Sequence, residues 1–204
     1  MGVFRVARPM ALSSDEGPLA TPWGVLSWSQ VLEMSLPGAL VGLIGGLIAG
    51  GLAAAGGLSP VVVVVTGLGL ALPLALVGAV YELLLATGKF PLGTLAPAAL
   101  LWVIAFPPIR VVHAAITDLV AGDSVAVPYG WAAFVVYQVL VAVPFAIGFW
   151  WLHENFAARW WFHIRERNPV ADHFVRVQLN YAVAAEEEKE RRRARAEARR
   201  AKRR

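Results

Sequence analysis

Apolar residues are gathered along the chain into four long, almost uncharged stretches. These are residues 36–58, 60–86, 90–109 and 131–152, the second of them carrying a single charge at Glu82. A helix needs about 20 predominantly apolar residues to cross the hydrocarbon core of a bilayer. A soluble core of a chain this short cannot bury four such stretches. The pattern therefore predicts an all-α integral membrane protein with four transmembrane helices.

The third stretch ends in Pro107-Pro108, which leaves a re-entrant hairpin as the alternative to a span. Lys and Arg residues accumulate in cytoplasmic loops, so their distribution helps to decide. Four spans put the basic C-terminal tail, Lys89 and the arginines at positions 5 and 8 on one side, and leave Arg110 and the loop containing Asp123 on the other. We therefore expect four spans with both termini cytoplasmic.

The first 35 residues precede the spans. Residues 1–20 form a polar lead, and Thr21-Pro22 is typical of an N-cap followed by proline at the first helical position. From residue 23 to 35, polar residues fall on one helical arc and Trp and aliphatic residues largely on the other. This segment is too short and too polar to span. It predicts an interfacial amphipathic helix, with an ordinary loop as the alternative.

The segment 153–204 follows the fourth span and predicts a cytoplasmic helical tail. Its first part is rich in Trp, Phe and Arg, which suits the headgroup layer, and Asn168-Pro169 predicts the start of a new helix. An apolar stripe on that helix and the arginines beyond it are candidates for binding a partner or lipid. The candidates are Trp160, Trp161, Phe174, Val177, Tyr181, Arg191, Arg192 and Arg193.

Composition and charge indicate where in the cell the protein is located. The chain is 58% hydrophobic and 16% charged, its net charge is +4, and the basic excess lies after residue 186. The tail fixes topology, and it also suits anionic lipid headgroups. Nucleic acid is a less favoured partner, because no aromatic residue follows Tyr181 to stack on bases. A bias toward Ala, Arg, Gly and Val resembles high-GC bacteria, so we expect the bacterial plasma (inner) membrane.

Glycines recur at every fourth position of the first stretch. They are Gly38, Gly42, Gly46 and Gly50. Residues four apart lie along one face of a helix. Lipid gives helices no hydrophobic reason to associate, so small residues that allow a close approach carry their packing. The pattern predicts a tight helix–helix interface, within the bundle or with another chain, and it assigns no activity.

Few polar residues remain within or beside the predicted spans. The candidates for a polar site are Glu82, Arg110, His113, Thr117, Asp118 and Gln138. An acid at membrane depth is a functional candidate, unless Glu82 reaches the interface and meets Lys89 or an N-terminal arginine. The group from Arg110 to Asp118 falls on one side of a helix. It is either a small polar site or the water-exposed face of an amphipathic helix at the outer surface. A buried amide such as Gln138 usually bonds to another helix.

No metal or cofactor is expected. The chain has no cysteine, which excludes disulfides and thiolate ligands. Of the four histidines, His113 and His153 are predicted at opposite ends of the bundle and cannot share a haem. No phosphate-binding loop, zinc-protease pair or nucleophile elbow is present. Catalysis is therefore not favoured.

The remaining features favour a small accessory, scaffold or structural subunit of a bacterial membrane protein complex, in contact with other subunits or with itself. Two alternatives stay open. One is a small oligomeric transporter or channel that uses the polar residues of spans 2 to 4. The other, weaker because no nucleophile–base pair can be assembled, is a lipid-modifying membrane enzyme.

Overall fold

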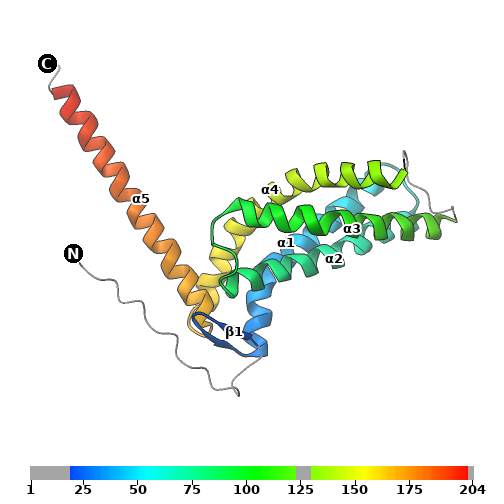
Figure 1. Ribbon diagram of the computed structural model, residues 1–204, viewed down its shortest axis with the longest axis horizontal. Coiled ribbons are helices and arrows are strands. Elements are labelled where there is room, and N and C mark those ends of the chain that lie inside the picture. Colours follow the sequence, from blue (N-terminus) through cyan, green and yellow to red (C-terminus); the bar gives the residue numbers. More distant parts are fainter. Residues whose placement is uncertain (1–18, 123–129, 202–204) are drawn as a thin grey trace.

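The computed structural model describes residues 19–122 and 130–201; the polar lead before residue 19, Asp123 and the last three residues lie outside this range. The described part consists of five helices and one small hairpin (Figure 1). These elements are β1 (Leu19–Thr21), β2 (Gly24–Leu26), α1 (Trp28–Ala55), α2 (Pro60–Ala86), α3 (Leu95–Ala121), α4 (Gly130–Ile164) and α5 (Pro169–Ala201).

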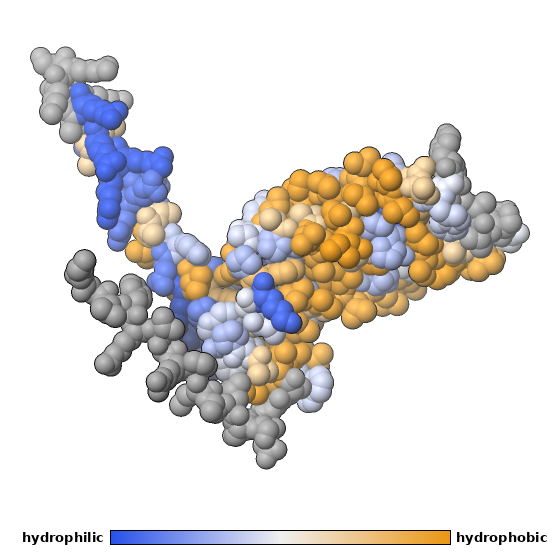
Figure 2. All heavy atoms as spheres, in the orientation of Figure 1, coloured by the Kyte–Doolittle hydropathy of each residue, from blue (hydrophilic) through white to orange (hydrophobic). Residues whose placement is uncertain are grey.

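Four of the helices, α1 to α4, are long and apolar enough to cross a membrane. The prediction of an all-α fold with four candidate spans is confirmed. Apolar side chains cover most of the face of the bundle seen in Figure 2, whereas α5 is hydrophilic over most of its length. Because so much exposed apolar surface requires lipid around it, the chain is a multi-pass membrane protein.

The predicted helix start at Thr21-Pro22 is wrong. Residues 19–26 form the antiparallel hairpin β1–β2, in which the Thr21 hydroxyl donates to the Gly24 carbonyl at 2.6 Å. The helix begins at Trp28 because Ser27 and Gln30 form a reciprocal capping box. The polar arc before residue 36 is therefore the first turns of α1 and not a separate helix.

Two residues of that polar arc, Gln30 and Glu33, bond to distant parts of the chain. Gln30 Nε2 donates to the Arg167 carbonyl at 2.5 Å, and Arg167 Nε lies 2.7 Å from Glu33 Oε1. Trp160 Nε1 donates to the Glu33 carbonyl at 2.8 Å. These bonds tie the start of α1 to the end of α4 and to the turn before α5. The sequence did not predict these bonds, because the partners lie more than 120 residues away along the chain.

The third stretch forms a continuous helix and not a re-entrant hairpin. α3 runs through Pro107-Pro108 without a break. It begins at Leu95, later than predicted, because a turn precedes it, with Gly93 at φ +75° and the Thr94 hydroxyl donating to the Pro91 carbonyl at 2.9 Å. At its C-terminal end, α4 extends beyond the fourth uncharged stretch, residues 131–152, to Ile164.

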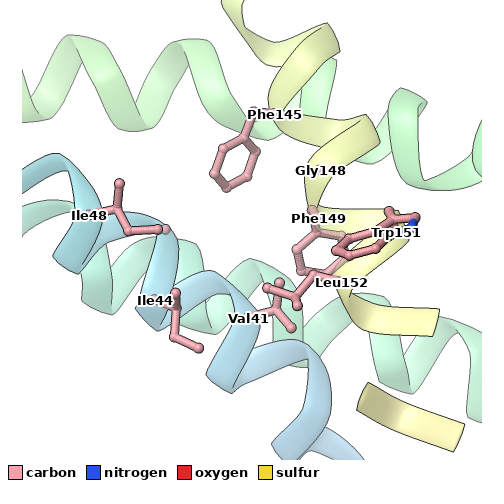
Figure 3. A pocket seen from close by; sticks show the side chains of 9 residues that line it. Val41, Ile44, Ile48, Phe145, Gly148, Phe149, Trp151 and Leu152 are labelled. Carbon is pink, nitrogen blue, oxygen red and sulfur yellow. The ribbon is translucent and has the colours of Figure 1, made fainter. Parts of the chain in front are cut away.

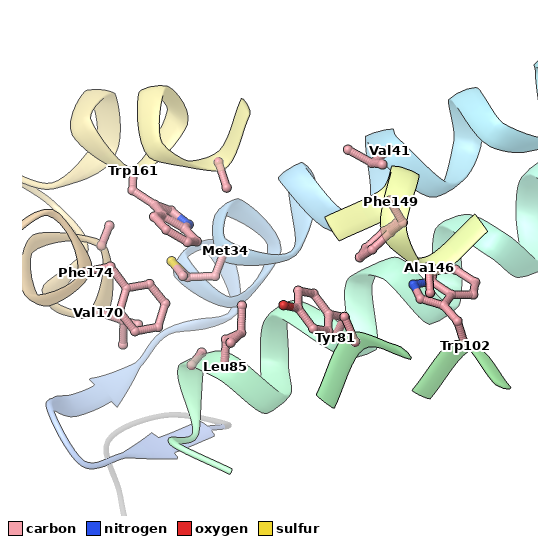
Figure 4. Packing of buried hydrophobic residues seen from close by; sticks show 14 of the residues in the cluster. Met34, Val41, Tyr81, Leu85, Trp102, Ala146, Phe149, Trp161, Val170 and Phe174 are labelled. Carbon is pink, nitrogen blue, oxygen red and sulfur yellow. The ribbon is translucent and has the colours of Figure 1, made fainter. Parts of the chain in front are cut away.

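Side chains from all five helices and the hairpin meet in one core. α1 packs along α2, α3 packs against α2 and α4, and α4 also contacts α1 and α5. Large buried side chains follow one another from Trp102 through Phe149 and Tyr81 to Trp161 and Phe174 (Figure 4). The transmembrane bundle and the base of α5 therefore share a hydrophobic core.

The base of α5 is fixed in several ways. Asn168 Oδ1 accepts from the backbone N–H groups of Val170 and Ala171 at 3.2 and 3.4 Å, which caps the helix as predicted. The Phe174 ring lies 4.8 Å from Trp161, and His173 stacks on Trp23 of the hairpin at 4.3 Å. Burial lowers the pKa of His173 below its usual 6.5, so it packs as a neutral ring at pH 7.

Candidate functional site

An acid and a histidine meet in the interior of the bundle. Glu82 Oε1 of α2 lies 2.7 Å from His153 Nε2 of α4, and both side chains are 0% exposed. Glu82 does not reach the interface to meet Lys89. Two ionisable groups this deep are costly unless they pair, and the pairing explains how α2 tolerates the acid.

The surroundings of this pair are aromatic, with one further acid. The His153 ring stacks on Phe149 at 5.8 Å and meets Tyr81 edge-on at 5.0 Å. Glu154 Oε1 lies 3.5 Å from His153 Nδ1. Glu82 Oε2 and the Tyr81 hydroxyl are buried and find no hydrogen-bond partner among the described residues. The site thus retains unused polar atoms that a proton or a small polar ligand can engage.

A second polar cluster joins α3 to α4. Arg110 Nη1 lies 2.9 Å from His113 Nδ1, and Arg110 Nε donates to Gln138 Oε1 at 3.3 Å. His113 is 6% and Gln138 3% exposed. The Thr117 hydroxyl donates to the backbone carbonyl of His113, four residues earlier. The side chains of Arg110, His113 and Gln138 therefore bridge two helices, and Thr117 is satisfied within its own helix.

Aromatic side chains separate the two clusters. Starting from His153, ring contacts lead through Phe149 to Trp102 at 4.8 Å, then to Phe145 at 4.7 Å and Phe106 at 5.2 Å. Arg110 follows Phe106 by one helical turn. The candidate residues thus form two sites at different depths, and Glu82 lies apart from the group of Arg110, His113 and Gln138.

The predicted glycine face lies against α2, inside the same chain. A Cβ atom added at Gly38, Gly42, Gly46 or Gly50 would come closer than 3.0 Å to backbone atoms of α2. The opposing backbone residues are Gly78, Leu74, Ala71 and Gly67. The four glycines therefore let the two helices approach closely, and this surface is not available to another chain.

Only part of the predicted partner- or lipid-binding set remains accessible. Trp161 and Phe174 are buried in the core, and Trp160 is half-buried against α1. Val177 is half-buried, whereas Tyr181 is 68% exposed. The side chains of Arg191, Arg192 and Arg193 are exposed. The first half of the apolar stripe on α5 therefore anchors the helix to its own bundle.

His153 is the residue that sequence reasoning missed. Its distance from His113 excludes a shared haem, but it does not exclude a pairing with an acid. One signal was present: Glu82 lies near the end of the second apolar stretch, and His153 directly follows the fourth. In a four-span bundle these two positions fall at the same end.

Within the described residues, no group of three or more His, Cys, Asp or Glu side chains could hold a metal ion. Comparisons with protein-family models, curated proteins and solved structures found no match. The four apolar helices thus define a multi-pass membrane protein.

Proposed function

We propose that the protein is a small, non-catalytic subunit of a bacterial plasma-membrane complex. The four-helix bundle anchors it in the bilayer, and α5 contacts a partner subunit on the cytoplasmic side. One observation carries this proposal. α5 leaves the bundle as a long helix whose second half contacts no other element of the described chain, although its base is firmly held (Figure 1).

The free part of α5 is long enough to be an interaction element. From residue 179 onward the described side chains are exposed, and at 1.5 Å per residue the helix extends for about 35 Å. Leu179, Tyr181 and Val183 expose apolar side chains near its base. An exposed helix with a fixed base presents its residues in a defined geometry, which lowers the entropic cost of binding.

Charges on this helix support a partner rich in acidic groups. Glu187–Arg191 and Glu188–Arg192 are ion pairs spaced four apart, which help to keep the exposed segment helical. Among the described residues, no carboxylate pairs with Arg193 or Arg195. The end of α5 is therefore positively charged, and it suits an acidic protein surface or anionic headgroups.

Chain ends and basic residues support the proposed orientation. The hairpin β1–β2 contacts α5 through Trp23 and His173, so both ends of the described chain lie at one end of the bundle. The loop carrying Lys89 lies at this end too, because Gly88 and Phe90 line a depression together with Tyr181. Basic residues that gather on one side indicate the cytoplasm.

Transport is the weaker interpretation. A pathway through one chain would have to connect the Glu82–His153 pair to the Arg110 cluster. The rings of Trp102, Phe145 and Phe149 fill the space between them. The buried charges are better explained as links between helices, since each pair joins α4 to another helix.

The proposed function predicts that loss of charge at the end of α5 releases the partner. Protein purified in mild detergent from its native membrane is expected to carry a partner, or a second copy of itself, at fixed stoichiometry. Reversing both unpaired arginines (Arg193→Glu with Arg195→Glu) is expected to weaken this association about tenfold or more, because each reversed charge turns attraction into repulsion. The stoichiometry is measured by cross-linking and quantitative mass spectrometry.

The matched control keeps the charge: Arg193→Lys with Arg195→Lys is expected to retain the partner. A lone monomer after cross-linking, or equal retention in the Glu and Lys variants, contradicts the proposal. Solute flux in liposomes that Glu82→Gln abolishes would favour transport instead.

A further inference from the structure

An apolar groove runs between α1 and α4 on the outside of the bundle (Figure 3). Its main part has a volume of about 340 Å³ and is lined by Ile44 and Ile48 of α1 and Phe145 and Trp151 of α4. A smaller depression of about 160 Å³ shares several of these walls and ends at Phe156. The two depressions share Val41, Ile44 and Leu152 as walls, so they adjoin each other along the apolar surface of the bundle.

The length of the groove matches one leaflet of a bilayer. Along α4 it extends from Phe145 to Phe156, which at 1.5 Å per residue is about 17 Å. Half of the hydrocarbon core of a bilayer is about 15 Å thick. A single extended acyl chain of one leaflet therefore has the right length to lie in it.

A positive charge lies beyond one end of the groove. Arg159 follows Phe156 by about one helical turn on the same face of α4, its side chain is exposed, and it has no carboxylate partner among the described residues. Glu33 of α1 lies at the same end, but Arg167 already neutralises it at 2.7 Å. Arg159 is therefore a cation without a carboxylate partner at this end of the groove, which is complementary to a phosphate headgroup.

The walls of the groove argue against a helix as the occupant. Helices associate in membranes where small residues form both surfaces. Here the rims are large side chains, Ile44 and Ile48 on one side and Trp151 on the other, which are 43%, 57% and 62% exposed. They hold a second backbone at a distance but leave space for a thin hydrocarbon chain.

We propose that the α1–α4 groove binds one acyl chain of an anionic phospholipid, whose headgroup phosphate is held by Arg159. Gly148 is essential to this site because it keeps the groove open. A Cβ added there meets no atom within 4 Å, so a larger side chain fills the groove without disturbing the fold.

Native mass spectrometry of the purified full chain, titrated with phosphatidylglycerol or with phosphatidylcholine of equal chain length, tests the proposal. The protein is expected to bind one phosphatidylglycerol about fivefold more tightly than phosphatidylcholine, through one basic side chain. Gly148→Leu is expected to weaken both lipids about tenfold, because its side chain takes the place of the acyl chain. Arg159→Gln is expected to remove the preference between headgroups, weakening phosphatidylglycerol more than phosphatidylcholine, because the choline cation already offsets the phosphate charge of phosphatidylcholine.

Gly51→Leu is the matched control. Gly51 of α1 is exposed, lies outside the groove, and also has no atom within 4 Å of an added Cβ. Equal lipid binding by Gly148→Leu and Gly51→Leu overturns the proposal. So does dimerisation through the groove: the chain has no cysteine, and rapid disulfide formation by Ile48→Cys in membranes would show that a second copy occupies it.

Discussion

Replacing His153 by alanine is expected to lower the free energy of unfolding by about 3–5 kcal/mol, because it leaves the buried carboxylate of Glu82 without its partner. The two side chains lie 2.7 Å apart and are 0% exposed, so bulk solvent does not reach the carboxylate in the original protein. Chemical or thermal denaturation of the purified protein in detergent micelles, followed by circular dichroism, measures the loss.

Replacing both residues by apolar ones distinguishes the energetic effect of the unpaired buried charge from that of the packing around it. Glu82→Met with His153→Met removes both charges at similar volume, and this double variant is expected to regain most of the stability. The exposed pair Asp172–Arg176 provides the control, since Arg176→Ala is expected to cost less than about 1 kcal/mol. A His153→Ala effect as small as that of the exposed pair contradicts the buried-pair geometry.

Substitution of Gly46 by leucine is expected to destabilise the bundle by about 3 kcal/mol or more, because the new side chain forces two closely packed backbones apart. A Cβ at this position would come closer than 3.0 Å to the backbone N and Cα of Ala71 on α2. Backbone atoms cannot move aside as the end of a flexible side chain can. The same denaturation experiment measures the loss.

The control lies on the same helix. Gly51→Leu introduces the same side chain five residues further along α1, where an added Cβ meets nothing within 4 Å. It is expected to leave stability within about 0.5 kcal/mol of the original protein. If Gly46→Leu and Gly51→Leu are equally stable, α1 and α2 do not approach each other through the glycines.

The number of spans followed from the sequence because apolar length is a local property. The bounds of α2 were predictable for the same reason: Ser59 and Pro60 mark its start, and the apolar run ends at residue 86. The start of α1 was not, because the predicted cap at Thr21 belongs to a hairpin held by its own cross-strand pairing, and the helix begins only after Ser27.

The candidate site was predictable only in part. Glu82 stood out as a lone acid in an apolar stretch, but its partner His153 is 71 residues away, and only the folding of the whole bundle brings the two side chains together. Arg110 and Gln138 were both singled out, yet their contact depends on the relative rotation of α3 and α4. The glycine face was predictable from its spacing, whereas its partner helix was not.

We propose four spans with both ends on the cytoplasmic side, and cysteine labelling tests this orientation most directly. Because the chain has no cysteine, Leu58→Cys, Lys89→Cys and Arg195→Cys each introduce a single thiol, in the α1–α2 turn, in the α2–α3 loop and on α5. With a membrane-impermeant maleimide on intact cells, Leu58→Cys is predicted to react, and the other two only after permeabilisation. Reaction of Leu58→Cys and Arg195→Cys from the same side would contradict the account.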